Sequence, residues 1–436
     1  MKSISLFFLF TMINIAVHAQ NIMVIEQNDN TIKEFKIEDI KQIYFKKITS
    51  DSLTTEPFNR TVLIYIAGDN SLAEFINSDL QEIIEGSKSI SNNEHRLMAF
   101  IDKRGEKPYI CEITLGELKK VKTFDQELNS GDPQTLQTAL KWVMDFFPSL
   151  SYGLVLWGHS DGWILRNDVV ENRAPRRAFG IDNTAGRSWM DIPQMATALS
   201  SLPRLKFIFA DCCAFQCVES AYELRNCADY IIASPAEIPG EGAPYHTVVP
   251  AMFDKADDFY KGIVDAYFDQ TSYGYKLPLS VVKTDEMENL AFTTKTALSS
   301  FVPNLENSGR YPDVEGLIYY YDHTQFDMQD FMLRYTDASQ YANWKKVFDQ
   351  TVVYKKMASV WIANHVRYNN NYYEFKDFIV TEERYGGLGM FVPQDVSTIT
   401  APEYQPNRLT FSIEALNTNI RKMQWYNAAG LNEVGW

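Results

Sequence analysis

Apolar runs alternate with helical periodicity along the middle of the chain. Mostly apolar runs occur at 61–67, 96–101, 152–157, 205–210, 230–233 and 279–282, with a hairpin pattern at 109–115 and 119–124. Such runs are typical of strands that are buried on both faces of a parallel sheet. Helical spacing lies between them at 71–86, 134–147 and 215–226. This alternation predicts an α/β/α sandwich around a mostly parallel sheet, in which ligands bind at the carboxyl ends of the strands.

The first twenty residues follow a different pattern. Lys2 precedes an apolar stretch from Ile4 to Val17, and Val17-His18-Ala19 is a small-residue cleavage site. These features predict a secretory signal peptide over residues 1–19. A retained membrane anchor is the less favoured alternative, because the stretch is short for a span of ~20 residues. We expect export to the periplasm, the cell surface or the medium, with no membrane span after the signal is removed.

The pattern divides the rest of the chain into three parts. Residues 20–59 alternate apolar and polar positions around Asn28-Asp29-Asn30, which predicts a small β appendage followed by a linker. Residues 60–283 form the α/β core. Residues 284–436 are less regular and are expected to pack on the core or extend it. Within them, helices are predicted at 341–356 and 407–416 and a strand at 385–392.

Composition narrows the function classes. Hydrophobic residues make up 45% of the 436 residues, so a large core is possible. The chain has 41 Lys and Arg against 56 Asp and Glu, a formal net charge of -15. That balance argues against nucleic acid and anionic lipid as partners, because both require a basic face. Five cysteines are an odd number, so at least one thiol lies outside any intramolecular disulfide.

Two predicted strands end in residues that can perform covalent chemistry. His159 follows the run at 152–157, and Cys213 follows the run at 205–210, just before the predicted helix at 215–226. A helix N-terminus favours a thiolate, and an imidazole can exchange its proton. A Cys–His pair of this kind catalyses acyl transfer. A single Cys or His is more often an inert packed side chain than a catalytic one. The hypothesis of a catalytic pair therefore depends on the two residues lying at two strand ends.

These blocks resemble the clostripain family of cysteine peptidases, which belong to the caspase-like clan. An apolar block ends in His159, and a second ends in Asp211-Cys212-Cys213. The likeness continues at 65–72, 218–224 and 233–245 and covers roughly residues 60 to 250. It implies a caspase-like α/β/α sandwich and a secreted endopeptidase that hydrolyses peptide bonds after Arg or Lys.

The resemblance also assigns roles to individual residues. Cys213 corresponds to the nucleophile and His159 to the catalytic histidine, while Cys212 is a bystander. Backbone N–H groups of Ser160 and Cys213 would hold the oxyanion. Asp211 would meet the basic side chain of the substrate, although helix capping is an alternative role for it. Weaker candidates for the same pocket, which could equally belong to a solvated loop, are Glu237 and Glu241.

Ser160 departs from the family pattern, which has Gly after the histidine. Serine keeps the backbone N–H, but a positive φ at this position would strain it. Ser160 and the N-terminal appendage motivate an alternative from another class, a catalytically silent binding module on the cell surface. A third possibility is a thiol acyl hydrolase with a non-peptide substrate.

An arginine-rich segment lies between the two candidate catalytic residues. A polar segment of this kind is usually a solvated loop, but the resemblance implies self-cleavage after a basic residue in this interval. The Arg177–Ala178 bond is the preferred site because it precedes the next family-like strand. The alternative sites are Arg176 and Arg173.

The remaining motifs predict no required cofactor. His95, His246, His323 and His365 lack the spacing of a zinc site. Calcium is possible, since some family members require it, and Asp161, Asp168 and Asp182 could supply ligands without forming an EF-hand. The expected partners are proteins or peptides with Arg or Lys before the scissile bond, and we expect a monomer.

Overall fold

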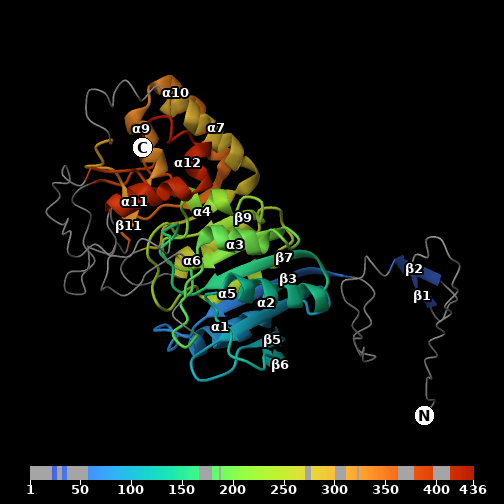
Figure 1. Cartoon of the computed structure of the whole chain (residues 1–436). Helices are drawn as coiled ribbons and strands as arrows, with labels where there is room; N and C mark the ends of the chain where they lie inside the picture. The colour runs from blue at the N-terminus through green and yellow to red at the C-terminus, as the bar shows by residue number, and fades with distance from the viewer. Residues whose placement is uncertain are drawn as a thin grey trace, which may run out of the picture. The chain divides into compact units, whose positions relative to one another are not determined.

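The chain folds into two compact units, Met1–Glu56 and Pro57–Trp436, in a computed structural model (Figure 1). The described residues are 22–26, 32–36, 57–165, 179–185, 188–270, 276–299, 311–321, 324–361, 378–395 and 413–436. In the first unit, β1 (Ile22–Glu26) pairs antiparallel with β2 (Ile32–Lys36), and Ile22 lies opposite Lys36. The alternating pattern around Asn28-Asp29-Asn30 therefore predicted this β appendage correctly.

A nine-stranded sheet forms the centre of the second unit, in the order β13-β10-β9-β8-β7-β3-β4-β5-β6. In chain order the strands are β3 (Phe58–Ala67), β4 (His95–Asp102), β5 (Tyr109–Thr114), β6 (Glu117–Thr123), β7 (Ser149–Trp157), β8 (Leu205–Asp211), β9 (Ala228–Ala233), β10 (Leu279–Lys283) and β13 (Val352–Lys356). The five central strands, β9, β8, β7, β3 and β4, are parallel to one another, and the strands outside them pair antiparallel. The predicted fold class is confirmed.

Side chains of the central strands alternate between two apolar layers. In β3, Val62, Ile64 and Ile66 enter one hydrophobic cluster, whereas Leu63 and Tyr65 enter the other. Successive side chains of a strand point to opposite faces, so a strand covered on both sides must be apolar at every position. This explains why the apolar runs of the sequence are continuous rather than alternating.

Helices cover both faces of the sheet. One face packs against α1 (Ile76–Ser87), α5 (Tyr245–Ala251) and α6 (Tyr260–Gln270). The other face packs against α2 (Pro133–Phe146), α3 (Ile192–Leu199) and α4 (Val218–Glu223). Asp132 caps α2 by accepting a hydrogen bond from the Gln134 N–H at 2.9 Å, and Pro133 occupies its first position. The arrangement is the three-layer sandwich that the periodicity predicted.

The C-terminal part extends the same unit. Its helices are α7 (Met287–Leu298), α9 (Met328–Tyr335), α10 (Ala338–Thr351), α11 (Ile413–Asn419) and α12 (Gln424–Ala428), which gather at one end of the unit (Figure 1). A small sheet joins β11 (Tyr319–Tyr321), β12 (Gln325–Asp327) and β14 (Gly389–Met390). The predicted helix at 341–356 is wrong beyond Thr351. Residues Val352–Lys356 form β13, which pairs with β10 at the edge of the main sheet.

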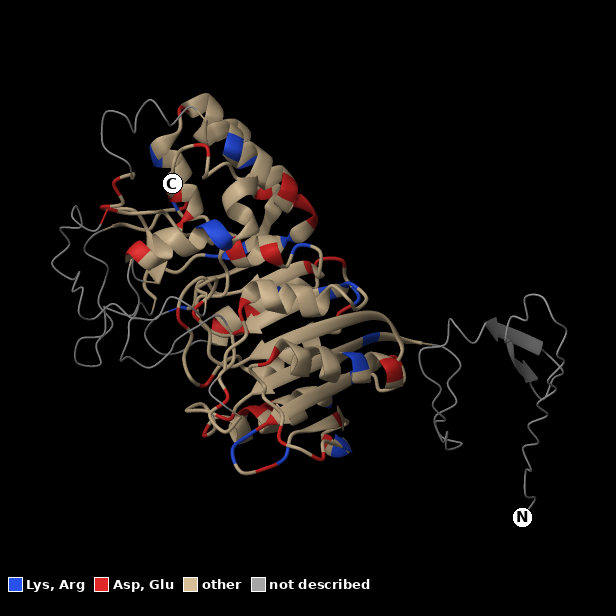
Figure 2. Cartoon of the chain, in the orientation of Figure 1, with Lys and Arg blue, Asp and Glu red and all other residues tan. Residues whose placement is uncertain are grey.

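Charged side chains are spread over the second unit. Figure 2 shows Asp and Glu positions on many of its loops and helices rather than on a single element. Among the described residues, no helix combines the length and the apolar character that crossing a membrane requires.

Candidate active site

The register of the parallel strands brings the two reactive motifs to one edge of the sheet. Trp157 at the end of β7 pairs with Asp211 at the end of β8. His159 and Cys213 each follow two residues later, just past the ends of these neighbouring strands, which lie about 4.8 Å apart. The parallel pairing therefore places His159 and Cys213 at the same carboxyl edge, where ligands bind in sheets of this type.

His159 is held by the turn that follows β3. Its Nε2 lies 2.8 Å from the Ser71 hydroxyl, and its backbone carbonyl accepts a hydrogen bond from Gly180 at 2.9 Å. Asn70 in the same turn donates to the carbonyls of Ala67 and Ile181. The turn after β3 thus contacts the imidazole of His159, and the segment 179–185 holds its backbone. Ser71 could not be predicted from the sequence, because nothing in the local pattern shows that this turn reaches the end of β7.

The Cys213 thiol lies against the loop that follows β9. The Ile238 N–H donates to Sγ at 3.4 Å, and Sγ lies 3.8 Å from the Ile238 carbonyl. Burial raises the pKa of the thiol, and the nearby negative charge of Glu237 raises it further. In this arrangement the thiol is neutral near pH 7, so its proton must be removed before the sulfur can attack a carbonyl.

The helix after Cys213 begins later than predicted. The sequence suggested a helix at 215–226, but α4 spans Val218–Glu223 and has Cys217 at its N-cap. Ala214 has a φ of 54°, and its N–H donates to the Ala236 carbonyl at 2.9 Å. The chain therefore turns sharply after Cys213 before it becomes helical. The expected stabilisation of a thiolate by a helix N-terminus is wrong for this geometry, because that effect fades within the first turn.

Ser160 fits its position without backbone strain. In the described part of the chain, the non-glycine residues with a positive φ are Leu115 and Ala214. Ser160 is 5% exposed, and its hydroxyl accepts a hydrogen bond from the Gly162 N–H at 3.0 Å. The concern that serine would be strained in place of glycine is therefore removed.

Asp211 is buried on the face of the sheet that α5 and α6 cover. It is 3% exposed and accepts hydrogen bonds from the Ala243 N–H at 2.9 Å and from the hydroxyls of Tyr245 at 2.8 Å and Tyr267 at 2.9 Å. Burial raises the pKa of this carboxyl despite the three donors. No helix begins at Asp211, so the alternative role as a helix cap is wrong.

A second buried carboxyl lies near Asp211. Asp79 of α1 accepts a hydrogen bond from the Trp157 indole N–H at 2.7 Å. Burial raises its pKa to about 7, and the negative charges of Asp211 and Glu82 contribute to the shift. Asp79 was not among the residues predicted for the site. The sequence signal that could have identified it is a charged side chain on the buried face of a helix, whose apolar positions are Ile76, Leu80 and Ile83.

The other predicted pocket residues are placed differently. Glu237 is partly buried and close enough to affect the Cys213 thiol, whereas Glu241 is exposed on the loop. Of the proposed calcium ligands, Asp161 accepts a hydrogen bond from Tyr321 at 2.6 Å, and Asp182 groups with Asp69 and Glu127. Outside the described residues lie Asp168, Arg173, Arg176 and Arg177.

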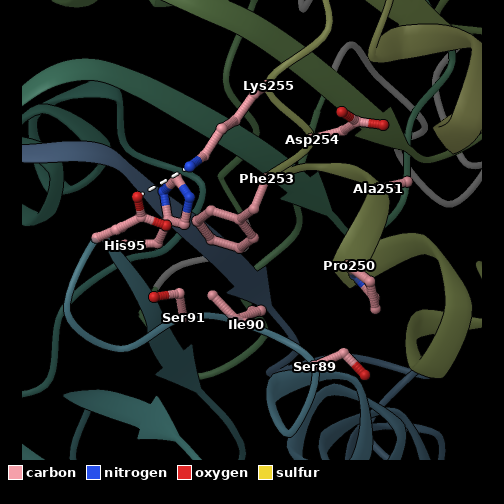
Figure 3. A pocket seen from close by; sticks show the side chains of 10 residues that line it. Ser89, Ile90, Ser91, His95, Pro250, Ala251, Phe253, Asp254 and Lys255 are labelled. Carbon is pink, nitrogen blue, oxygen red and sulfur yellow. Dashed lines mark hydrogen bonds and ion pairs between the residues drawn. The ribbon is translucent and has the colours of Figure 1, made fainter.

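A pocket of about 430 Å³ lies elsewhere in the unit (Figure 3). Its lining includes His95 at the start of β4, Phe253, and the ion pair between Lys255 and Glu94 at 2.8 Å. The start of β4 lies at the amino edge of the parallel strands, opposite the edge that carries His159 and Cys213. This pocket is therefore separate from the candidate active site.

Comparison with known proteins identifies the family. The model of the clostripain family matches residues 64–426. A solved structure of a secreted C11 cysteine protease from Bacteroides thetaiotaomicron, in complex with an irreversible peptide inhibitor, is 27% identical and has a TM-score of 0.69. An inactive zymogen C11 protease from Parabacteroides distasonis is 28% identical and has a TM-score of 0.70. Each comparison covers 86% of this chain and 99% of the other.

None of the curated proteins compared with the chain matches it. The family match nevertheless extends over most of the sequence and includes both strand ends that carry His159 and Cys213. The chain belongs to the clostripain family of cysteine proteases.

Proposed function

We propose that the protein is an endopeptidase that cleaves after Arg or Lys, with Cys213 as nucleophile and His159 as its proton partner. The observation that carries the proposal is the Trp157–Asp211 pairing, which sets both residues at the same carboxyl edge. The sulfur attacks the scissile carbonyl and forms an acyl-enzyme, which water then hydrolyses. The imidazole takes the thiol proton and delivers it to the departing amine.

Ser71 has a positioning role in this scheme. In the neutral ring, donation of the Nε2 proton to Ser71 leaves Nδ1 as the basic nitrogen. The hydroxyl of Ser71 would also stabilise the imidazolium that forms when the thiol loses its proton. A base fixed in this way can ionise a thiol that its own surroundings keep neutral.

The preference for a basic side chain is supported by two buried carboxyls. Asp211 and Asp79 lie near each other, and burial raises the pKa of both. A guanidinium or ammonium group of the substrate that reached these carboxyls would form a charge pair with them, which offsets the cost of burying their negative charge. Such a desolvated pair discriminates strongly against neutral side chains. The acidic residues spread over the unit would also favour the approach of basic peptides (Figure 2).

Export and self-processing are further parts of the proposal. The signal-like N-terminus supports export, and one related protein is described as secreted. The neutral Cys213 thiol is consistent with an uncleaved precursor, and another related protein is described as an inactive zymogen. Cleavage after Arg177, or after Arg176 or Arg173, would cut the segment between the two catalytic residues.

The decisive assay is hydrolysis of short amide substrates that end in Arg or Lys, with Leu-ended and Asp-ended substrates for comparison. We expect turnover of the basic substrates only, and its loss in Cys213→Ala. Cys111→Ala is a matched control, because Cys111 is a buried thiol on β5 whose sulfur contacts the Ala99 carbonyl at 3.6 Å. A processed wild-type protein that hydrolyses no basic substrate contradicts the proposal. If a basic acyloxymethyl ketone also fails to label Cys213, the silent binding module is favoured.

A further inference from the structure

The small sheet of the C-terminal part contacts the turn that follows Cys213. In its middle strand β12, Gln325 is 0% exposed, and its side-chain Nε2 donates to the Ala214 carbonyl at 2.6 Å. In the neighbouring strand β14, the Gly389 N–H donates to the Gln216 carbonyl at 2.9 Å. Two strands of this sheet therefore hold the backbone immediately after the candidate nucleophile.

Ala214 needs such support because its backbone is left-handed. Its φ of 54° is unfavourable for any residue that carries a Cβ. A residue in such a conformation persists only where its surroundings fix it. The Ala214 N–H donates to the Ala236 carbonyl at 2.9 Å, and the Ala214 carbonyl accepts from Gln325. These two hydrogen bonds together set the direction in which the chain leaves Cys213.

The loop after β7 reaches the same point. Gly162 has a φ of 67°, and a Cβ added to it would lie 2.5 Å from both the Ala214 carbonyl oxygen and Nε2 of Gln325. Only glycine fits so close an approach. A second contact joins the small sheet to this loop, since the hydroxyl of Tyr321 in β11 donates to Asp161 at 2.6 Å. The small sheet thus contacts both loops of the candidate active site.

We propose that Gln325 is a positioning residue for catalysis, which holds the Ala214 peptide so that the thiol and backbone N–H of Cys213 face the substrate. The inference rests on the proposed role of Cys213 as nucleophile. Gln325 acts through Ala214 rather than through the substrate. Its place gives the small sheet a function, because a small misplacement of a nucleophile relative to its proton partner lowers the rate by a large factor.

Gln325→Met tests this role, because methionine nearly keeps the side-chain volume and removes the donor. For an Arg-ended amide substrate, kcat should fall about tenfold and KM should stay within about twofold, since the nucleophile is disturbed and the side-chain pocket is not. Gln329→Met is the matched control. Gln329 is also buried, and its Nε2 also donates to a backbone carbonyl at 2.6 Å, that of Glu383. It should lose similar stability and keep the kcat of the wild type.

Gln325→Glu adds a signature that a general folding defect would not give, and it keeps the inference testable if Gln325→Met does not fold. A protonated carboxyl can donate to the Ala214 carbonyl, whereas an ionised carboxylate can only accept. Because burial raises the pKa of a carboxyl, kcat relative to the wild type at the same pH should recover as the pH falls from about 8 to about 5.5. A ratio that does not change with pH contradicts the role of Gln325 as a donor.

Hydrogen exchange of the Ala214 amide tests the positioning without peptidase activity, in full-length protein on the Cys213→Ala background. The exchange should be about tenfold faster with Gln325→Met than in the parent and unchanged with Gln329→Met. A wild-type protein that hydrolyses no basic substrate would contradict the proposed function, while the exchange rate of Ala214 still reports on Gln325. Equal exchange rates with Gln325→Met and Gln329→Met, or an unchanged kcat in Gln325→Met, overturn the inference.

Discussion

Burial controls the protonation of the acidic groups at the carboxyl edge of the sheet. The pKa of the Cys213 thiol and those of the carboxyls of Asp211 and Asp79 are all raised, and burial is the largest cause in each case. Burial therefore disfavours the charged form of all three groups. That condition costs stability, and groups that serve function rather than folding are the ones expected to carry such a cost.

Asp79→Asn is expected to stabilise the protein while weakening its preference for basic substrates. In the folded state the carboxyl has a pKa of about 7, compared with about 3.9 in the unfolded chain. At a pH below both values the Asp79 carboxyl is protonated in both states, so it does not change the free energy of unfolding. As the pH rises between the two values, the unfolded state loses its proton first and the protein loses stability. This loss levels off above pH 7. The gain in the free energy of unfolding from Asp79→Asn should therefore grow from pH 4 to pH 7 and reach roughly 1–3 kcal/mol.

Urea unfolding from pH 4.5 to 8 on the Cys213→Ala background measures this difference. In the active protein, KM for Arg substrates should rise in Asp79→Asn. A difference in stability that does not change with pH would show that Asp79 is not held protonated by burial. Glu85→Gln is a suitable control, because it removes an exposed acid from the same helix.

Ser71→Ala tests the positioning of the imidazole. Loss of the 2.8 Å contact to Nε2 should lower kcat by about tenfold and leave KM nearly unchanged, because the contact supports proton transfer rather than substrate binding. The pH profile of kcat should shift, which a purely structural defect would not cause. Ser200→Ala, an exposed hydroxyl at the end of α3, should behave as wild type. An unchanged kcat and pH profile in Ser71→Ala would remove Ser71 from the mechanism.

At the scale of elements, the parallel strands could be predicted and the short elements could not. The central strands are apolar at nearly every position because helices cover both faces, so their runs are visible in the sequence. Helix α4 is shorter than its apolar pattern suggested, because the chain after Cys213 first makes backbone hydrogen bonds with the loop after β9. Likewise, β13 continues directly from α10 and becomes a strand because β10 offers it an open edge. The local sequence cannot predict the outcome where the preference of a segment competes with pairing to a distant strand or loop.

Ser160→Gly addresses the link between β7 and the segment 179–185. Ser160 has no positive φ and forms a bridge with Phe179, so restoring the glycine of the family pattern should not relieve strain. We expect kcat/KM within about twofold of wild type and a loss of stability of about 0.5–1 kcal/mol, from the greater freedom of glycine in the unfolded chain. Substrate hydrolysis and urea unfolding measure the two quantities. A large gain in activity would show that serine impairs the oxyanion site after all.

At the scale of the whole molecule, self-processing would convert one chain into two. The candidate bonds lie between the strand that ends near His159 and the strand that ends near Cys213, in a segment outside the described residues. Cutting there would separate the part of the chain that carries His159 from the part that carries Cys213. Such a cut would change the surroundings of the Cys213 thiol, whose pKa burial raises.

Incubation of purified wild-type protein should yield two fragments with a new N-terminus at Ala178, as measured by mass spectrometry. Cys213→Ala should remain intact, and Arg177→Ala should be cleaved more slowly or after Arg176 or Arg173. Production of the same two fragments by pure Cys213→Ala protein would exclude the autocatalytic route.

The sequence by itself determined the three-layer architecture, the family and the two strand ends that carry His159 and Cys213. These features are local: an apolar run marks a buried strand, and a residue just past the run lies at its carboxyl end. Only the tertiary structure decided which groups surround those residues. Ser71 reaches His159, Asp79 approaches Asp211, and Asp69 meets Asp182, each across a long stretch of chain. Such contacts depend on how strands are ordered in the sheet and on which turns extend beyond its edge, and no spacing along one segment encodes them.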